Sequence, residues 1–130
     1  MKKKIFLTAT ILGLTALFFG AYANHGLRPL ISNDSFESFQ TGIRYQLYHA
    51  LFLFIVGILP ILNLFQRKII FYLVLIGVIL FSGSIYLLST NSLTNTDFIS
   101  FGILTPVGGL VLIFGWIILA YYIFINQSQK

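Results

Sequence analysis

The sequence predicts an all-α integral membrane protein, a single domain over residues 1–130 built as a bundle of four transmembrane helices joined by short loops. Charged residues make up 8% of the 130 positions, against about 25% in a soluble domain, and 58% of the residues are hydrophobic. The charges leave four uninterrupted stretches, at 5–27, 45–66, 69–96 and 98–129. Each is longer than the roughly 20 residues that a helix needs to cross a bilayer. A soluble globule, a disordered chain and a nucleic-acid-binding protein are excluded.

The distribution of cations predicts that both termini face the cytoplasm. The expected spans are roughly 5–23, 45–65, 69–88 and 104–125, with outer loops at 24–44 and 89–103. With the N-terminus inside, only Arg28 and Arg44 fall outside. The other cations lie on the inner side, where Lys and Arg accumulate in membrane proteins: Lys2, Lys3, Lys4, Arg67, Lys68 and Lys130.

The first span carries a stripe of small residues on one face, which allows another helix to approach closely. This stripe consists of Ala9, Gly13, Ala16 and Gly20. A cleaved signal peptide is the alternative, because residues 21–23 resemble a cleavage site. The apolar stretch of about 19 residues exceeds the usual signal core of roughly 7–15, and a disposable signal needs no packing face. We therefore favour a retained first helix over cleavage after Ala23.

The first outer loop is expected to contain a short amphipathic helix. Residues 34–37 resemble a capping box with Asp34 as the cap. Phe36, Phe39 and Ile43 then recur at helical spacing. This pattern predicts a helix on the outer membrane surface, with Gly42 as the bend before the second span.

The later spans carry their own punctuation. Pro60 should kink the inner part of the second span, and residues 66–68 should form the tight turn into the third. Thr105 before Pro106 predicts the start of the fourth helix. Small and hydroxylated residues in the third and fourth spans are expected to pack between helices: Ser82, Gly83, Ser84, Gly108, Gly109 and Gly115.

The polar side chains with chemical potential gather, by this topology, near the outer face. His25 closes the first span and His49 lies about one turn inside the second. They predict either a bis-histidine metal or haem site, or a head-group pocket; alternatively, each histidine bonds a loop carbonyl or Glu37. Two histidines without a third ligand are a weak signal, so neither a metal nor a cofactor is predicted. The pocket would also contain Arg44, Glu37, Tyr45, Gln46 and Tyr48.

Residues that are missing narrow the function. No ionisable Asp, Glu, Lys or Arg lies in the middle of a span, whereas coupled transporters place such groups near the midplane. The sequence has no cysteine, which excludes disulfides and thiol chemistry. It also has no nucleophile–base pair or HExxH-type motif, and so predicts no enzyme.

Five segments resemble the YgdD/YwdK-like family of small bacterial membrane proteins of unknown function. They are residues 20–27, 41–51, 80–86, 105–109 and 115–116, which touch all four spans in order. In the first segment Ala23 and Asn24 replace a Gly and an Ala of the family pattern, while His25 is kept. The resemblance implies a multi-pass protein of the bacterial plasma membrane. It supplies no activity and no catalytic residue.

Three functional hypotheses follow. The leading one is a non-enzymatic structural or accessory subunit that associates with itself or a larger membrane complex through its small-residue faces. The alternative is a cofactor-, metal- or lipid-binding protein that uses the His25/His49 pocket. The third is a small oligomeric channel or transporter. The lipid bilayer is the partner that the composition itself implies.

Overall fold

Helices account for almost the whole chain, as its apolar composition predicts. The computed structural model describes residues 1–127, so Lys130, counted above among the inner cations, lies outside the described residues. π-helical turns follow α1 and α3, and short 3₁₀ segments flank the outer connections. The α-helices are α1 (Lys2–Tyr22), α2 (Asn33–Ile58), α3 (Leu64–Val78), α4 (Ser84–Ser89) and α5 (Leu104–Gln127).

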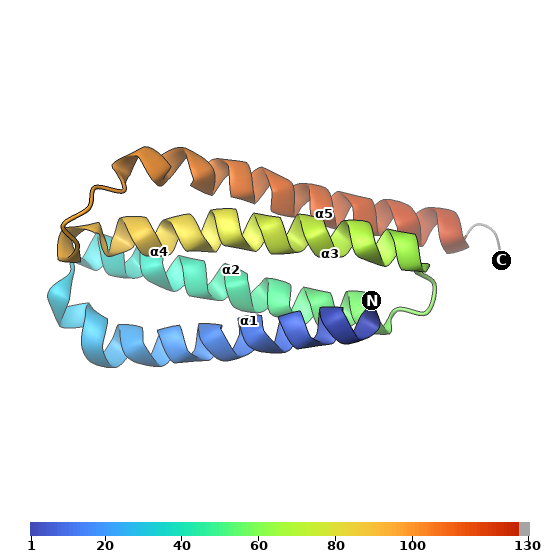
Figure 1. Cartoon of the computed structure of the whole chain (residues 1–130), viewed down its shortest axis with the longest axis horizontal. Coiled ribbons are helices and arrows are strands. Elements are labelled where there is room, and N and C mark those ends of the chain that lie inside the picture. Colours follow the sequence, from blue (N-terminus) through green and yellow to red (C-terminus); the bar gives the residue numbers. More distant parts are fainter. Residues whose placement is uncertain (128–130) are drawn as a thin grey trace.

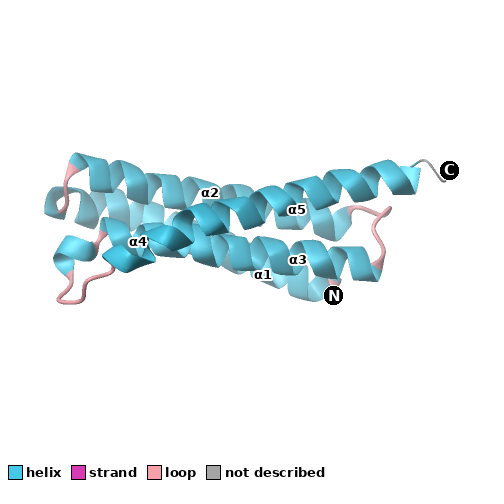
Figure 2. Ribbon diagram, turned by 90° about the horizontal axis from the view of Figure 1, so that it is seen from above, coloured by secondary structure: helices cyan, strands magenta, loops and turns pink. Residues whose placement is uncertain are grey.

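The π-helical turn Ile79–Gly83 joins α3 and α4 into one rod, so the bundle consists of four helical rods. Successive rods run antiparallel. The start of α1 and the end of α5 lie at the same end of the bundle (Figure 1). The view from above shows loops only at the two ends (Figure 2). The predicted all-α, four-helix architecture is confirmed. The cytoplasmic position of the termini stays a prediction; in the following, the inner end of the bundle is the end at which α1 starts, and the outer end is the opposite one.

Three of the four rods are long and apolar enough to cross a membrane: Lys2–Leu30, Leu64–Ser89 and Ile99–Gln127. The remaining rod, α2, carries Asp34, Glu37 and Arg44 in its first half. It packs against α1 on one side and against α3 and α4 on the other. Its polar side chains Gln46 and His49 are therefore covered by protein.

The second helix begins much earlier than predicted. Ser32 is its cap, with Oγ accepting from the Ser35 N–H at 3.2 Å, whereas Asp34 lies in the first turn. The helix runs on through Gly42, where a Cβ would lie 2.8 Å from Cε1 of Tyr86. Gly42 is thus a point of close approach and not a bend. One buried stripe continues through this helix at 3–4 spacing, which explains why it is unbroken: Phe36, Phe39, Ile43, Gln46, Ala50 and Leu53.

The inner connection also differs from the prediction. Helix α2 ends at Ile58, so Pro60 lies in the loop and kinks no helix. Asn63 and Gln66 form a reciprocal capping box that starts α3, a signal the sequence reading missed. Arg67 therefore lies in the first turn of α3, buried, with Nε donating to the Val56 carbonyl at 3.4 Å and Nη2 to that of Leu59. The guanidinium covers the carbonyl end of α2, where a cation is favourable.

The small-residue stripe of α1 faces α2 over most of its length. Ala9 and Ala16 are buried, and a Cβ on Gly13 would lie 4.0 Å from the Ala50 Cβ. The prediction that Gly20 packs against another helix is wrong, because a Cβ there would meet open space. Ala23 and Leu27 beyond it are buried again in one cluster with Phe36 and Phe39 of α2, so Gly20 interrupts the packed face.

Helix α5 approaches the third rod most closely at the π-helical turn Ile79–Gly83. A Cβ on Gly108 would overlap the backbone nitrogen of Phe81, and one on Gly115 would lie 3.3 Å from Cγ2 of Val74. Gly109 is looser, 3.5 Å from the Phe81 ring. Gly83 meets nothing within 4 Å and so is not a packing residue, contrary to prediction, because the extra residue of the π-helical turn changes which side chains face α5.

Two serines of the third rod make contacts to other helices. Ser82 is buried and donates from Oγ to the Gly42 carbonyl at 2.8 Å. Ser84 Oγ lies 2.6 Å from Oγ1 of Thr105. The prediction that Thr105 caps α5 is wrong, because the helix already starts at Leu104 and Thr105 lies in its first turn.

Candidate functional site

The structure does not bring the two histidines together. His25 lies exposed in the turn after α1, whereas His49 is buried in α2. One turn before His49, Gln46 bonds Thr15 of α1, and His25 lies about 15 Å farther along the helix axis at about 1.5 Å per residue. The predicted His25/His49 pocket is therefore wrong. Since α2 starts at Asn33, His49 lies roughly 24 Å from the outer end.

His49 instead joins α2 to α5. Its Nδ1 lies 2.7 Å from the Tyr45 carbonyl oxygen, and the indole N–H of Trp116 donates to Nε2 at 3.3 Å. A neutral ring with its proton on Nδ1 satisfies both contacts, so the tautomer follows from the partners. Within residues 1–127, no group of three His, Cys, Asp or Glu side chains is placed to hold a metal ion.

Gln46 forms a second buried contact, between three helices. Its Nε2 donates to the Leu12 carbonyl at 2.8 Å and to Thr15 Oγ1 at 2.7 Å. Its Oε1 accepts from the Tyr86 hydroxyl at 2.7 Å. The amide thus links α1, α2 and α4 with its acceptor and donor both engaged, which is the condition for a stable buried polar group.

The other members of the predicted pocket disperse around α2. Arg44 and Glu37 approach to 3.7 Å, but their side chains are 53% and 72% exposed. Tyr48 is exposed. The Tyr45 ring packs on Phe81 with centroids 4.9 Å apart. Of this group, Tyr45 and His49 line one cavity together.

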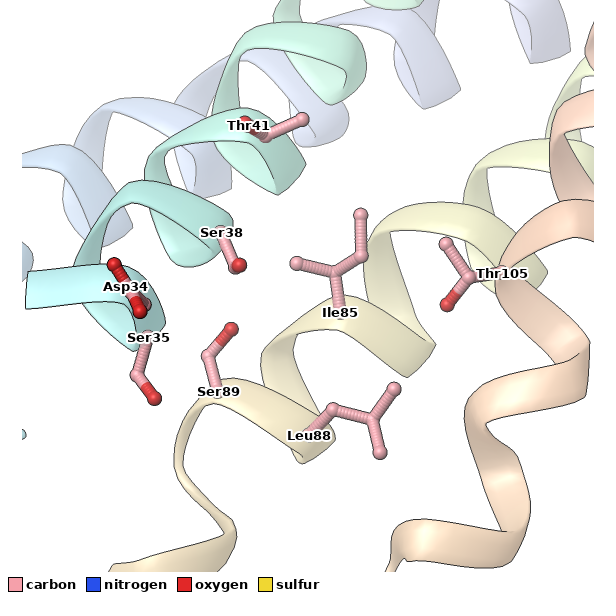
Figure 3. A pocket seen from close by; sticks show the side chains of 8 residues that line it. All are labelled: Asp34, Ser35, Ser38, Thr41, Ile85, Leu88, Ser89 and Thr105. Carbon is pink, nitrogen blue, oxygen red and sulfur yellow. The ribbon is translucent and has the colours of Figure 1, made fainter. Parts of the chain in front are cut away.

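A cavity that was not predicted from the sequence, the outer cavity, lies at the outer end of the bundle. It has a volume of about 420 Å³, and its walls come from α2, α4 and the start of α5 (Figure 3). Six of its eight lining residues carry a carboxylate or a hydroxyl group; the lining consists of Asp34, Ser35, Ser38, Thr41, Ile85, Leu88, Ser89 and Thr105.

A second cavity of about 380 Å³, the inner cavity, lies deeper along the same helices. Aromatic and aliphatic side chains dominate its lining, which also includes the His49 imidazole. Trp116 and Ile113 are about half exposed, so the cavity opens at the lateral surface of the bundle. It is lined by Tyr45, His49, Phe81, Gly109, Leu112, Ile113 and Trp116.

The linings of the two cavities follow one another along the same helices, about one turn apart. On α2 this step is from Thr41 to Tyr45, and on α5 it is from Thr105 to Gly109. Side chains four residues apart share one helix face. We treat the two as one feature, the α2–α5 crevice; hydroxyl groups gather in its outer cavity, and aromatic and aliphatic side chains dominate its inner cavity.

Ser89 marks the crevice as a place for a ligand. Its side chain is only 4% exposed, and its Oγ has no hydrogen-bond partner among the described residues. Figure 3 shows its hydroxyl directed toward that of Ser38 across the cavity. A buried hydroxyl left unpaired costs about 1–3 kcal/mol, which a bound polar group would recover.

A signal for the crevice is present in the sequence once residues 33–58 are treated as one helix. A second stripe then accompanies the buried one, at spacings of three and four residues that place its members on one side of α2: Asp34, Ser38, Thr41, Tyr45 and His49. Reading residues 24–44 as a loop hid this stripe.

Comparisons with known proteins match the chain almost end to end. The model of a family described as "Protein of unknown function (DUF423)" matches residues 19–109. The UPF0382 membrane protein YwdK of Bacillus subtilis is 33% identical over 119 residues, 90% of this chain and 93% of that protein. A UPF0382 membrane protein of Haemophilus influenzae is 30% identical over 128 residues, 98% of this chain and 99% of its own.

A eukaryotic relative is similar as well. The UPF0382 membrane protein C1782.12c of Schizosaccharomyces pombe is 32% identical over 109 residues, 83% of this chain and 91% of that protein. No solved structure matches the chain.

Proposed function

Because the chain belongs to the DUF423 family of UPF0382 membrane proteins, whose function is unknown, we propose that it is a non-enzymatic membrane protein that binds a lipid in the α2–α5 crevice. The observation that carries this proposal is that hydroxyl and carboxylate groups gather in the outer part of the crevice, whereas aromatic and aliphatic side chains dominate its inner part. A ligand that fills both parts must itself be an amphiphile.

The dimensions of the crevice suit a lipid. From Asp34 to His49, α2 rises by roughly 22 Å, whereas one leaflet of hydrocarbon is about 15 Å deep. The crevice therefore covers a head-group layer and most of one leaflet. Below His49 the interior is filled by buried apolar side chains, including Phe52, Val56 and Phe71, so a ligand would enter from the side.

We propose further that the protein lies in the bacterial plasma membrane. Relatives named as membrane proteins support a membrane location for the chain itself. The yeast relative means that the family is not restricted to bacteria.

The accessory-subunit hypothesis has less support. It rested on small-residue faces, but Ala9, Ala16, Gly108 and Gly115 pack against other helices of the same chain. These residues therefore account for internal packing and leave little of the predicted faces for a partner.

Lipid retention tests the proposal. The protein would be purified in a mild detergent, and co-purifying lipid would be measured by native mass spectrometry and by extraction. We expect the wild-type chain to retain lipid and Gly109→Leu to lose most of it, since a Cβ at Gly109 is tolerated and a longer side chain extends into the inner cavity.

Gly20→Leu is the matched control, because Gly20 faces open space on α1 and the same replacement of Gly by Leu changes helix propensity by the same amount. Circular dichroism would verify that both variants fold. Equal lipid retention by both variants, or none by the wild type, would contradict the proposal.

A further inference from the structure

We infer that the α2–α5 crevice selects lipids whose head group carries a protonated primary amine beside a phosphate, with the ammonium at Asp34 and the phosphate between Ser38 and Ser89. This inference rests on the proposed lipid binding and goes further by naming the head-group class. Three features of the outer cavity support it: its charge, its free hydroxyl groups and its lack of aromatic rings.

The outer cavity contains a carboxylate and no cation. Asp34 is its one charged lining residue. The nearby cations are engaged elsewhere: Arg44 pairs with Glu37 at 3.7 Å, and the guanidinium of Arg28 lies 5.1 Å from the Phe36 ring centroid. Within residues 1–127, no cation lies within ion-pair distance of Asp34. A head group with a net negative charge would meet this carboxylate uncompensated, whereas an ammonium would pair with it.

Two hydroxyl groups are available for a phosphate. Thr41 already donates to the Glu37 carbonyl at 3.0 Å, and Thr105 shares a bond with Ser84. Ser38 and Ser89 project from α2 and α4 toward one another (Figure 3), and the Ser89 Oγ is buried without a partner. Two free donors on opposite walls match two phosphate oxygens of one group.

The same cavity disfavours a quaternary ammonium. Proteins recognise such groups with aromatic faces, and none of the eight lining residues of the outer cavity is aromatic. A primary ammonium has three N–H donors that carboxylate and hydroxyl oxygens accept. The aromatic residues of the crevice all line the inner cavity, at the depth of the acyl chains.

The single tryptophan of the chain makes the inference testable. Trp116 lines the inner cavity and is about half exposed at the lateral surface, so quenching in Gly109→Leu gives the contribution of surrounding lipid, and the excess over it in the wild type reports lipid in the crevice. The purified protein would be reconstituted in phosphatidylcholine nanodiscs with a minor fraction of one lipid carrying brominated acyl chains, which quench tryptophan on contact. Brominated phosphatidylethanolamine, phosphatidylcholine and phosphatidylglycerol with identical chains would be compared.

We expect brominated phosphatidylethanolamine to quench Trp116 at about one tenth of the mole fraction that the other two require, the factor typical of one charge-assisted hydrogen bond. Asp34→Asn should reduce this preference to about twofold or less, and Ser38→Ala with Ser89→Ala should weaken binding of all three phospholipids. Glu37→Gln is the control, because Glu37 lies on the same helix but outside the crevice.

The outcomes separate this inference from the proposed function. Equal quenching by the three lipids in the wild type, reduced in Gly109→Leu, would overturn the head-group assignment and leave lipid binding in place. Quenching that is the same in the wild type and in Gly109→Leu would overturn both. A preference that survives Asp34→Asn would also refute the role of Asp34.

Discussion

Trp116 of α5 donates its indole N–H to Nε2 of His49 in α2, and the two residues are 67 positions apart in the chain. Both side chains line the inner cavity. The Trp116 ring also packs on Phe52 with centroids 4.4 Å apart. One hydrogen bond and one ring contact thus hold α5 against α2 at the depth where the crevice is apolar.

Replacing Trp116 by Phe should destabilise the protein, because a ring is kept against Phe52 while the donor to His49 is removed. An unpaired buried acceptor costs about 1–3 kcal/mol, so the midpoint of thermal unfolding in detergent should fall. Tyr48→Phe is the control, since the Tyr48 ring is exposed and its midpoint should not change. Equal midpoints for the wild type and Trp116→Phe would refute a structural role for this bond.

Gln46 and Tyr86 should be energetically coupled. Gln46→Leu removes the partner of the Tyr86 hydroxyl and of Thr15, and should destabilise the chain by about 2–3 kcal/mol. Tyr86→Phe alone should cost about 1 kcal/mol. Because the second change has little left to remove once the first is made, the double variant should be less destabilised than the sum of the singles. Additive effects in unfolding measurements would contradict this network.

Gly108→Ala should be severely destabilising, since its Cβ would overlap the backbone of the π-helical turn at Phe81. Backbone yields less readily than a side chain, and overpacking costs about 1–3 kcal/mol. Gly83→Ala is the matched control in the facing rod, where a Cβ meets open space and helix propensity improves by up to about 1 kcal/mol. The two alanines should therefore shift the unfolding midpoint in opposite directions, and shifts of the same sign would refute the close approach.

The orientation of the bundle is open to chemical labelling, because the chain contains no cysteine. A membrane-impermeant maleimide added to intact spheroplasts should label Asn95→Cys, in the loop before α5, and not Lys3→Cys. Permeabilisation should expose Lys3→Cys, as the distribution of cations requires. The reverse pattern would show an inverted topology. Absence of any full-length product carrying Lys3→Cys would indicate cleavage of the first helix.

The bundle itself was predictable because bilayer thickness constrains the sequence so strongly. Stretches without charge have to be long enough to cross the hydrocarbon, and their backbone has to be helical to satisfy its own hydrogen bonds. The bounds of α2 were not predictable in the same way. Asp34, Glu37 and Arg44 look like loop residues in isolation, yet the stripe beneath them is apolar and buried against other helices.

The helical class, the number of rods and most of the close-packing residues were predictable, since they depend on local composition and spacing. Which side chains meet depends on the tertiary structure. It separates His25 from His49, and it brings Asp34 and Ser38 opposite Ser89 at the outer end of the bundle. Small residues such as Gly108 indicate that a helix approaches closely, but the atom it meets, here the backbone of Phe81, depends on the register of two helices distant in the chain, which local spacing does not specify.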